Sequence, residues 1–170
     1  MSAVAKHAAA PLRDEQAPRV DLCWRPRRDW GALPALRRAA RHALAAEGFT
    51  HGALSVAVVG RRAMARLHWR HMAVRGPTDV LTFDLGTDRA RGRIDGEVVV
   101  CADVARARAP RGGDRRGAAE LALYVVHGIL HLAGYDDHDA AGYQAMHARE
   151  DALLTEIGLG PVFQRAARET

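Results

Sequence analysis

The chain has 170 residues and a formal net charge of +5 at pH 7. Its composition, 48% hydrophobic and 26% charged, is that of a globular protein and excludes wholesale disorder. A chain of this length forms one domain that buries a core without a disulfide or metal staple. All of the 25 basic residues except Lys6 are arginines, whose planar guanidinium suits phosphate. Composition alone fits a nucleic-acid partner and a general bias toward Arg, Ala and Gly equally well.

No run of residues reaches the ~18 apolar positions of a membrane span. Cys23 and Cys101 lie far apart, outside any CxxC motif. These features indicate a protein of the reducing cytoplasm with no membrane partner. The first residues lack a continuous apolar core, so they do not read as a targeting peptide. We expect three parts along the chain: a disordered leader at 1–19, the folded domain at 20–160 and a C-terminal tail at 161–170.

The expected elements alternate strands and helices in the first half of the chain and end in helices. Short apolar runs predict strands over residues 20–24, 53–59, 79–83 and 94–101. Apolar positions at helical spacing predict helices over residues 29–47, 61–70, 103–109, 118–133 and 140–157. We expect Asp29 to cap the first helix, Tyr143 to face inward from the last, and residues 111–116 to form a flexible basic loop. This order predicts a single compact α+β domain in which a small mixed sheet packs with about five helices.

Candidate chemistry is concentrated in residues 127–138, which read HGILHLAGYDDH. His127 and His131 lie four residues apart on a predicted helix, so both imidazoles project from one face. That spacing suits two ligands of one tetrahedral metal ion. Gly134 permits a turn back after the helix, so the acidic residues and the histidine that follow can supply a third ligand. Two partnerless imidazoles on so apolar a helix would be costly, which favours a metal site over a structural role.

Zinc is the metal we expect, because imidazole and carboxylate ligands in an open site suit it, although nickel, copper and iron accept the same ligands. Such an ion lowers the pKa of its water toward ~7 and supplies hydroxide for attack on a carbonyl carbon or a phosphorus. The helix is similar to the HExxH helix of zinc peptidases, but Gly128 stands where that motif has its glutamate base. Peptide hydrolysis is therefore a minor alternative.

The sequence resembles the YbeY family of bacterial rRNA maturation factors in three motifs that follow the family's order. The family pattern H-G-x-L-H-L-x-G-Y-D-H is matched from His127 through Asp136. The pattern P-T-D-V-L-S-F-P corresponds to residues 77–84, which read PTDVLTFD. A G-[DE]-[IV]-x-[IV] strand corresponds to residues 96–100, which read GEVVV. The resemblance extends over about residues 20–157.

The resemblance implies a zincin-like metal helix and a zinc-dependent endoribonuclease, specific for single strands, with one Zn²⁺ ion. It implies a role in small-subunit rRNA maturation and ribosome quality control. The implied partners are single-stranded RNA, rRNA and the small ribosomal subunit, with no DNA expected. A ribosome-associated assembly factor whose metal is mainly structural is the alternative from another class, followed by the zinc peptidase. No catalytic side chain is assigned.

One departure from the family pattern concerns the third metal ligand. The family's third ligand is a histidine that falls at Asp137 here, one residue before His138. The unchanged distance to the downstream Met146 favours Asp137, and aspartate is an ordinary zinc ligand. A loop shifted by one residue would instead bring His138 to the metal. The predicted ligands are therefore His127, His131 and either Asp137 or His138.

A second departure concerns RNA binding. The arginine that the family is thought to use for substrate falls at Met72, so Arg70 and Arg75 are the nearest candidates to replace it. The pattern fits equally well two solvent-exposed arginines that have no part in RNA binding. Residues 61–93 hold eight arginines against three acidic residues, a greater local excess than in the chain as a whole. We therefore interpret this segment, which the resemblance places beside the metal helix, as a local phosphate-facing surface.

Overall fold

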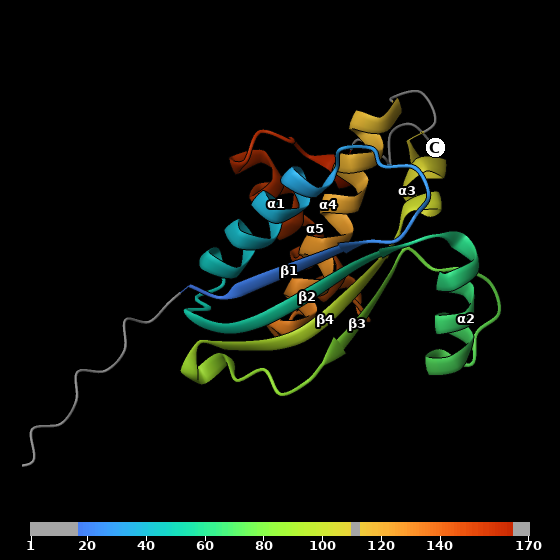
Figure 1. Cartoon of the computed structure of the whole chain (residues 1–170). Helices are drawn as coiled ribbons and strands as arrows, with labels where there is room; N and C mark the ends of the chain where they lie inside the picture. Colours follow the sequence, from blue (N-terminus) through green and yellow to red (C-terminus); the bar gives the residue numbers. More distant parts are fainter. Residues whose placement is uncertain (1–16, 110–112, 165–170) are drawn as a thin grey trace, which may run out of the picture.

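The computed structural model describes residues 17–109 and 113–164. These residues form one four-stranded sheet in the order β1-β2-β4-β3, made of β1 (Arg19–Trp24), β2 (His51–Val59), β3 (Val80–Asp84) and β4 (Arg93–Cys101). β1, β2 and β4 run parallel, whereas β3 is antiparallel to β4 at the edge of the sheet (Figure 1). The mixed sheet expected from the sequence is confirmed.

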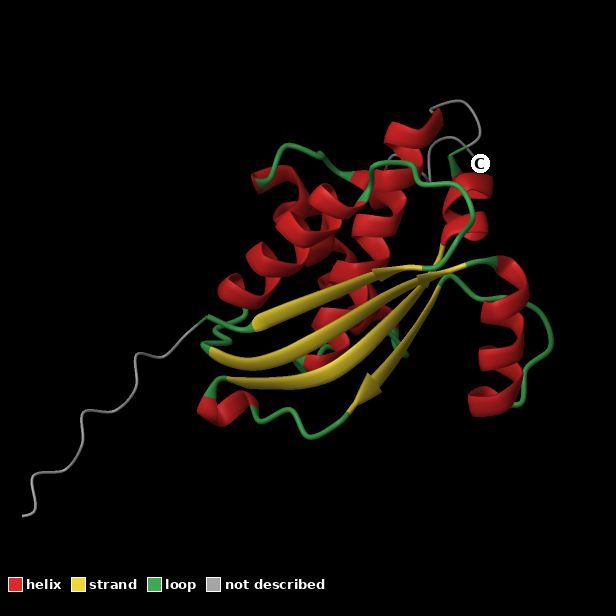
Figure 2. Cartoon of the chain, viewed as in Figure 1, coloured by secondary structure: helices red, strands yellow, loops and turns green. Residues whose placement is uncertain are grey.

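Five α-helices and one short 3₁₀-helix accompany the sheet in the described residues. They are α1 (Leu33–Ala46), α2 (Arg61–Met72), η1 (Arg89–Arg91), α3 (Ala102–Arg108), α4 (Gly113–Leu132) and α5 (Ala140–Glu156). Figure 2 shows α1, α4 and α5 gathered on one side of the sheet, with α2 apart at the end of the strands. The prediction of an α+β domain with about five helices is confirmed.

Side-chain alternation along β4 assigns the two faces of the sheet to different helices. Ile94 and Val98 face the main core with α1, α4 and α5. Val99 and Cys101 point the other way, into a smaller cluster with Met64 of α2. Successive side chains of a strand leave opposite faces, so α2 and α4 are separated by the thickness of the sheet. α4 is the most buried helix and carries the predicted metal ligands.

The helix expected from Asp29 begins later than predicted. α1 starts at Leu33 with Ala32 as its N-cap, and Pro34 stands in its first turn, where proline is well tolerated. Asp29 instead accepts a hydrogen bond from the backbone N–H of Gly31 at 2.8 Å. Its side chain therefore closes a turn ahead of the helix, and the predicted cap was wrong.

The expected loop at residues 111–116 is also corrected in part. Residues 110–112 lie outside the described residues, but α4 already begins at Gly113. Asp114 lies in the first helical turn and pairs with Arg28 at 2.9 Å and with Arg106. An acidic side chain at this end complements the helix dipole, so these pairs favour an earlier start than the apolar pattern indicated. Tyr143 differs too: it is 45% exposed rather than inward-facing.

The predicted leader and tail are described only where they adjoin the domain. Residues 1–16 and 165–170 lie outside the described residues, whereas Arg19 already pairs with Ala53 in the sheet. Val162 is buried and Phe163 packs against the core. The boundaries at 20 and 160 otherwise stay predictions. Within the described ranges, no helix combines the length and the apolar character needed to cross a membrane.

Candidate metal centre and its cavity

α4 lies so close to the sheet that glycine is required at position 128. A Cβ atom on Gly128 would lie 2.8 Å from Cγ1 and from Cγ2 of Val98, and 2.9 Å from Oγ1 of Thr82. The position that holds the glutamate base in zinc peptidases therefore faces β3 and β4 here. With Gly128 against the sheet, His127 and His131 project from another side of α4, where their side chains are 17% and 30% exposed.

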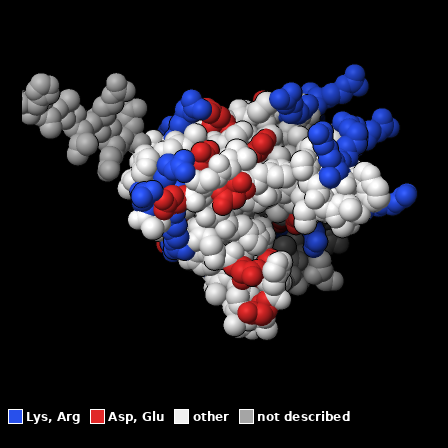
Figure 3. All heavy atoms as spheres, turned by 90° about the horizontal axis from the view of Figure 1, so that it is seen from below, with Lys and Arg blue, Asp and Glu red and all other residues white. Residues whose placement is uncertain are grey.

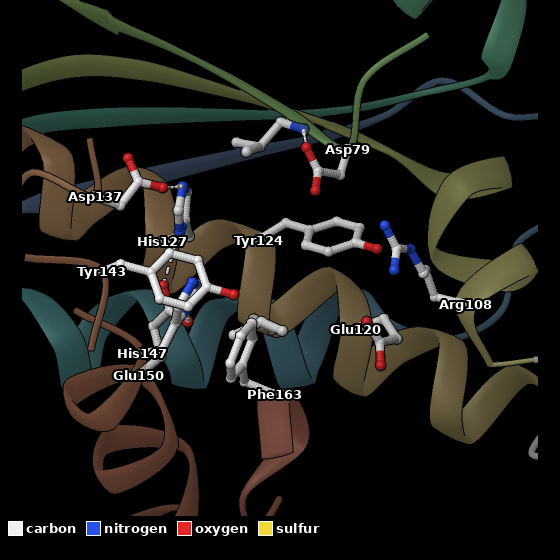
Figure 4. Close-up of a pocket in the computed structure, with 12 residues that line it drawn as sticks. Asp79, Arg108, Glu120, Tyr124, His127, Asp137, Tyr143, His147, Glu150 and Phe163 are labelled. Carbon is white, nitrogen blue, oxygen red and sulfur yellow. Dashed lines mark hydrogen bonds and ion pairs between the residues drawn. The ribbon is translucent and has the colours of Figure 1, made fainter. Parts of the chain in front are cut away.

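Two imidazoles and one carboxylate converge at this place. Nε2 of His127 lies 2.9 Å from Nε2 of His131. The carboxylate oxygens of Asp137 lie 3.9 Å from each of these nitrogens, Oδ2 from His127 and Oδ1 from His131. The three residues form a set of potential ligand atoms within 4.8 Å of one another. Figure 4 shows Asp137 and His127 facing each other across the site.

The outer nitrogens of both histidines are already engaged. Nδ1 of His127 donates to Oε1 of Glu150 at 2.7 Å, and Nδ1 of His131 donates to the carbonyl oxygen of Tyr135 at 3.1 Å. With each proton on Nδ1, each Nε2 presents a lone pair toward the other. Two lone pairs at this separation repel unless a cation or a proton lies between them. The donor set therefore fits a divalent metal held by imidazole and carboxylate.

Charge around His127 favours a cation at the site. Burial lowers the pKa of His127, but the hydrogen bond and charge of Glu150, with the charges of Asp137 and Asp79, outweigh it and raise that pKa above its ordinary value. The same negative groups that attract a proton attract a metal ion. In the metal-free protein a proton on Nε2 would satisfy the contact between the two imidazoles.

His138, the alternative third ligand, lies away from the two Nε2 atoms. Its side chain is 88% exposed, and its Nδ1 lies 3.7 Å from Oδ1 of Asp136. The loop rests on the start of α5, where a Cβ atom on Gly142 would lie 2.2 Å from the carbonyl oxygen of Asp136. Asp137 is thus the residue brought to the histidines, and its role as a ligand stays a prediction.

Sequence reasoning missed Glu150 and His147. Glu150 is fully buried, and its second oxygen accepts a hydrogen bond from Nδ1 of His147 at 2.6 Å. The sequence position of Glu150 could have indicated its burial, because it lies in the apolar stripe of α5 with Met146 and Leu153. A carboxylate in such a stripe requires hydrogen-bond partners, since burying it unpaired is costly.

A cavity of about 480 Å³ opens beside His127. Its floor is α4, and its walls come from the start of β3, the end of α3, α5 and the segment after α5 (Figure 4). The lining residues are Asp79, Val80, Arg108, Glu120, Leu123, Tyr124, His127, Asp137, Tyr143, His147, Glu150 and Phe163. Arg108 is the only arginine among these lining residues.

The arginines of residues 61–93 do not form one surface beside the metal helix. Those of α2 lie across the sheet from α4, and those near η1 lie at the other end of β2 (Figure 1). Near η1, the arginines are paired with acids: Arg89 with Glu47, Arg91 with Asp88 and Arg93 with Asp95. Arg89 alone among them also reaches the end of α4, where it donates a hydrogen bond to the carbonyl oxygen of Ala133. The face of the molecule drawn in Figure 3 has basic side chains at both of its ends, and acidic side chains lie among them at one end. The expectation of a single phosphate-facing surface is corrected.

The two arginines predicted to bind RNA are in the group at α2. Arg70 lies in the last turn of the helix, and the guanidinium of Arg75 lies 5.5 Å from the ring centroid of Trp69. Both are exposed, and neither lines the cavity at His127. Their role in binding RNA stays a prediction.

The sequence of the chain matches those of a known protein family. The family model described as "Endoribonuclease YbeY" matches residues 32–158. The chain is 38% identical over 112 residues to proteins named "Endoribonuclease YbeY" from Mycobacterium ulcerans and Mycobacterium tuberculosis. These matches cover 61% of this chain and 62% and 63% of the two relatives, which is less than two thirds of their length.

The fold is also similar to a solved structure. A Thermotoga maritima protein, determined in solution, aligns with 81% of this chain and 90% of its own length. The TM-score is 0.55 and the sequence identity 23%, so this likeness supports the fold alone.

Proposed function

Because the chain belongs to the YbeY family, we propose that it is a zinc-dependent endoribonuclease that cleaves single-stranded RNA during maturation of small-subunit rRNA. The observation that carries this proposal is the convergence of His127, His131 and Asp137 at the edge of a cavity. Asp79 and Val80 of the P-T-D-V motif line the same cavity, so two of the recognised motifs meet there.

In this proposal, one Zn²⁺ ion is held by Nε2 of His127, Nε2 of His131 and the carboxylate of Asp137. When bound, the ion supplies Lewis-acid chemistry and an activated oxygen nucleophile for attack on phosphorus. The chain's own residues prepare the ligands. Glu150 fixes the ring of His127 and the Tyr135 carbonyl that of His131, so both keep their basic nitrogens toward the site.

The partial exposure of the ligand set supports catalysis over a purely structural metal. Structural zinc sites are closed by four protein ligands, whereas catalytic sites keep a position open. Here three donors converge, and the side chains of His131 and Asp137 are 30% and 26% exposed. The contact between Gly128 and Val98 argues against the peptidase alternative, because no carboxylate fits where the peptidase base stands.

The proposed setting is the cytoplasm, on or near the small ribosomal subunit, in rRNA maturation and ribosome quality control. Free Cys23 and Cys101 are consistent with a reducing compartment. Arg70 and Arg75, exposed on and after α2, are proposed to contact phosphates of the RNA away from the cleaved bond.

The proposal is tested with zinc-loaded protein on matched single-stranded and double-stranded RNA. We expect cleavage of the single strand, loss of cleavage with chelator, and at least a hundredfold loss in the His127→Ala and His131→Ala variants. His138→Ala is the matched control for Asp137→Asn: only the second is expected to lose zinc and activity. Undiminished cleavage by His131→Ala protein would rule out the zinc-nuclease mechanism.

The same experiment separates the alternatives. An assembly factor with a structural metal predicts that chelation unfolds the protein and that the loaded form leaves RNA intact. A peptidase predicts hydrolysis of unstructured peptides by the loaded form.

A further inference from the structure

One carboxylate oxygen of Asp79 faces the cavity without a hydrogen-bond partner among the described residues. Its Oδ1 accepts from the backbone N–H of Val80 at 2.8 Å and from the hydroxyl of Thr78 at 3.0 Å. These two bonds fix the carboxylate, and Figure 4 shows its other oxygen pointing into the cavity above Tyr124. This second oxygen of Asp79 is therefore held in place and can accept a hydrogen bond from a ligand in the cavity.

Tyr124 and Arg108 add hydrogen-bond donors to the cavity, in contrast to the acceptor oxygen of Asp79. Tyr124 lies three residues before His127 on α4, which places it about 4.5 Å farther along the helix axis from the metal ligands. Its hydroxyl points toward the guanidinium of Arg108 (Figure 4). The cavity therefore offers an acceptor at Asp79 and donors at Arg108, with Tyr124 between them.

Aromatic rings form the outer wall. The ring of His147 lies flat on that of Phe163, with centroids 3.6 Å apart and an interplanar angle of 5°. Tyr143 contacts His147 edge-on at 4.2 Å and is 45% exposed at the mouth of the cavity. An exposed aromatic ring beside a polar cavity is the arrangement by which proteins hold an unstacked base.

We propose that this cavity binds one unpaired nucleobase of the RNA, guanine in preference to uracil, next to the phosphate that meets the metal ligands. The inference rests on the proposed function. Guanine carries N–H donors at N1 and N2 and acceptors at O6 and N7, which match the Asp79 oxygen and the Arg108 guanidinium. Uracil has a single N–H donor and forms fewer of these bonds.

Charge explains why a base rather than a phosphate occupies the cavity. Beyond the predicted metal ligands and the fully buried Glu150, the charged side chains that line it are Asp79, Glu120 and Arg108. A phosphate group there would be repelled by the cavity-facing oxygen of Asp79, whereas an uncharged base donates N–H groups to that oxygen. The volume of about 480 Å³ lies in the range of small-ligand sites.

The test measures binding by the zinc-loaded full chain of short unstructured oligoribonucleotides. They carry a non-hydrolysable methylenephosphonate at the central linkage and differ only in the base beside it. We expect the guanine oligonucleotide to bind about tenfold more tightly than the uracil one, the factor that one added hydrogen bond gives.

Asp79→Asn is the decisive variant. Its amide oxygen can keep the bonds from Val80 and Thr78, so only the cavity-facing atom changes, from acceptor to donor. We expect the preference for guanine to disappear. Tyr143→Ala is expected to weaken binding of both the guanine and the uracil oligonucleotide about 10- to 100-fold. Arg108→Ala is expected to weaken binding of the guanine oligonucleotide most. Arg38→Ala removes another exposed arginine, on α1, and is expected to leave the ranking of bases unchanged.

The inference would be overturned by a base ranking in the Asp79→Asn protein identical to that of the unchanged chain, or by tighter binding of uracil than of guanine by the unchanged chain. Loss of binding in Trp69→Ala with none in Tyr143→Ala would place the base at α2 and also overturn it. Absence of cleavage with guanine preference intact would refute the proposed function and support the cavity. Cleavage of RNA without any base preference in binding would refute the cavity alone.

Discussion

Glu150 and His127 face each other across the contact between α5 and α4, with Oε1 of the carboxylate 2.7 Å from Nδ1 of the imidazole. Glu150 also accepts from His147, so both of its oxygens are in use and neither reaches water. A single buried charge therefore connects the last helix to the predicted metal ligand.

Glu150→Gln tests this connection. The amide has the same shape, but its NH₂ group must face one of the two Nδ1–H donors. We expect zinc affinity to fall 10- to 100-fold and the free energy of unfolding of the metal-free protein to fall by about 1–3 kcal/mol. Competition with a chromophoric chelator and urea unfolding measure the two effects. Glu156→Gln, on the exposed end of the same helix, is the control and is expected to change zinc affinity little.

Gly128→Ala tests the close approach of α4 to the sheet. Alanine normally stabilises a helix by about 1 kcal/mol relative to glycine. Here the added methyl group would lie 2.8 Å from two carbons of Val98, so we expect destabilisation by about 1–3 kcal/mol instead. Urea unfolding of the metal-free protein measures it. Gly117→Ala, on the same helix, meets only the half-buried ring of Trp30, closest at 3.0 Å, and should cost less; equal costs would contradict the explanation.

Removal of zinc from the loaded protein is expected to lower Tm while leaving helix content unchanged. The ligand side chains are held by Glu150 and the Tyr135 carbonyl, and α4 is embedded in the apolar core, so neither depends on the ion. Thermal unfolding and far-ultraviolet circular dichroism with and without chelator measure both quantities. Collapse of the helical signal on chelation would instead indicate a structural metal.

Asp84 predicts a component of the pH dependence of stability. Hydrogen bonds from the backbone N–H groups of Thr87, at 2.8 Å, and Gly86, at 3.0 Å, hold the pKa of Asp84 below its ordinary value of 3.8. The carboxylate therefore stabilises the fold above pH 3.8, and this contribution is lost as the pH falls through the lower folded pKa.

Asp84→Asn should accordingly be less stable near pH 7, by less than about 1 kcal/mol because the side chain is exposed. The difference should vanish below the folded pKa. Urea unfolding of both proteins at neutral and acidic pH measures it, and a difference that grows on acidification would contradict the assignment.

The fold was largely predictable because its strands and helices follow strong local patterns. The run of apolar residues in β2 and the spacing of His127 and His131 depend only on neighbours in sequence. The start of α1 was not predictable in this way, because Asp29 closes a turn with Gly31 and satisfies the same backbone preference that a cap would.

The candidate site was predictable in its two histidines and not in what surrounds them. Asp137 and His138 are adjacent, and the contact between Asp136 and the first turn of α5 decides which of them faces the helix. Glu150 is far from the histidines in sequence, so only the packing of α5 on α4 brings it there. Likewise, the connection through β3 separates the arginines before it from those after it, although they are close in the chain.

β3 is an edge strand whose alternate side chains face α2 and α4, so these two helices lie on opposite faces of the sheet beside this edge. An RNA that touched Arg70 and Arg75 as well as the cavity at His127 would have to pass around the β3 edge, spanning several nucleotides. Short fragments would reach only one side. The length of RNA that the protein protects therefore reports whether both faces take part in binding.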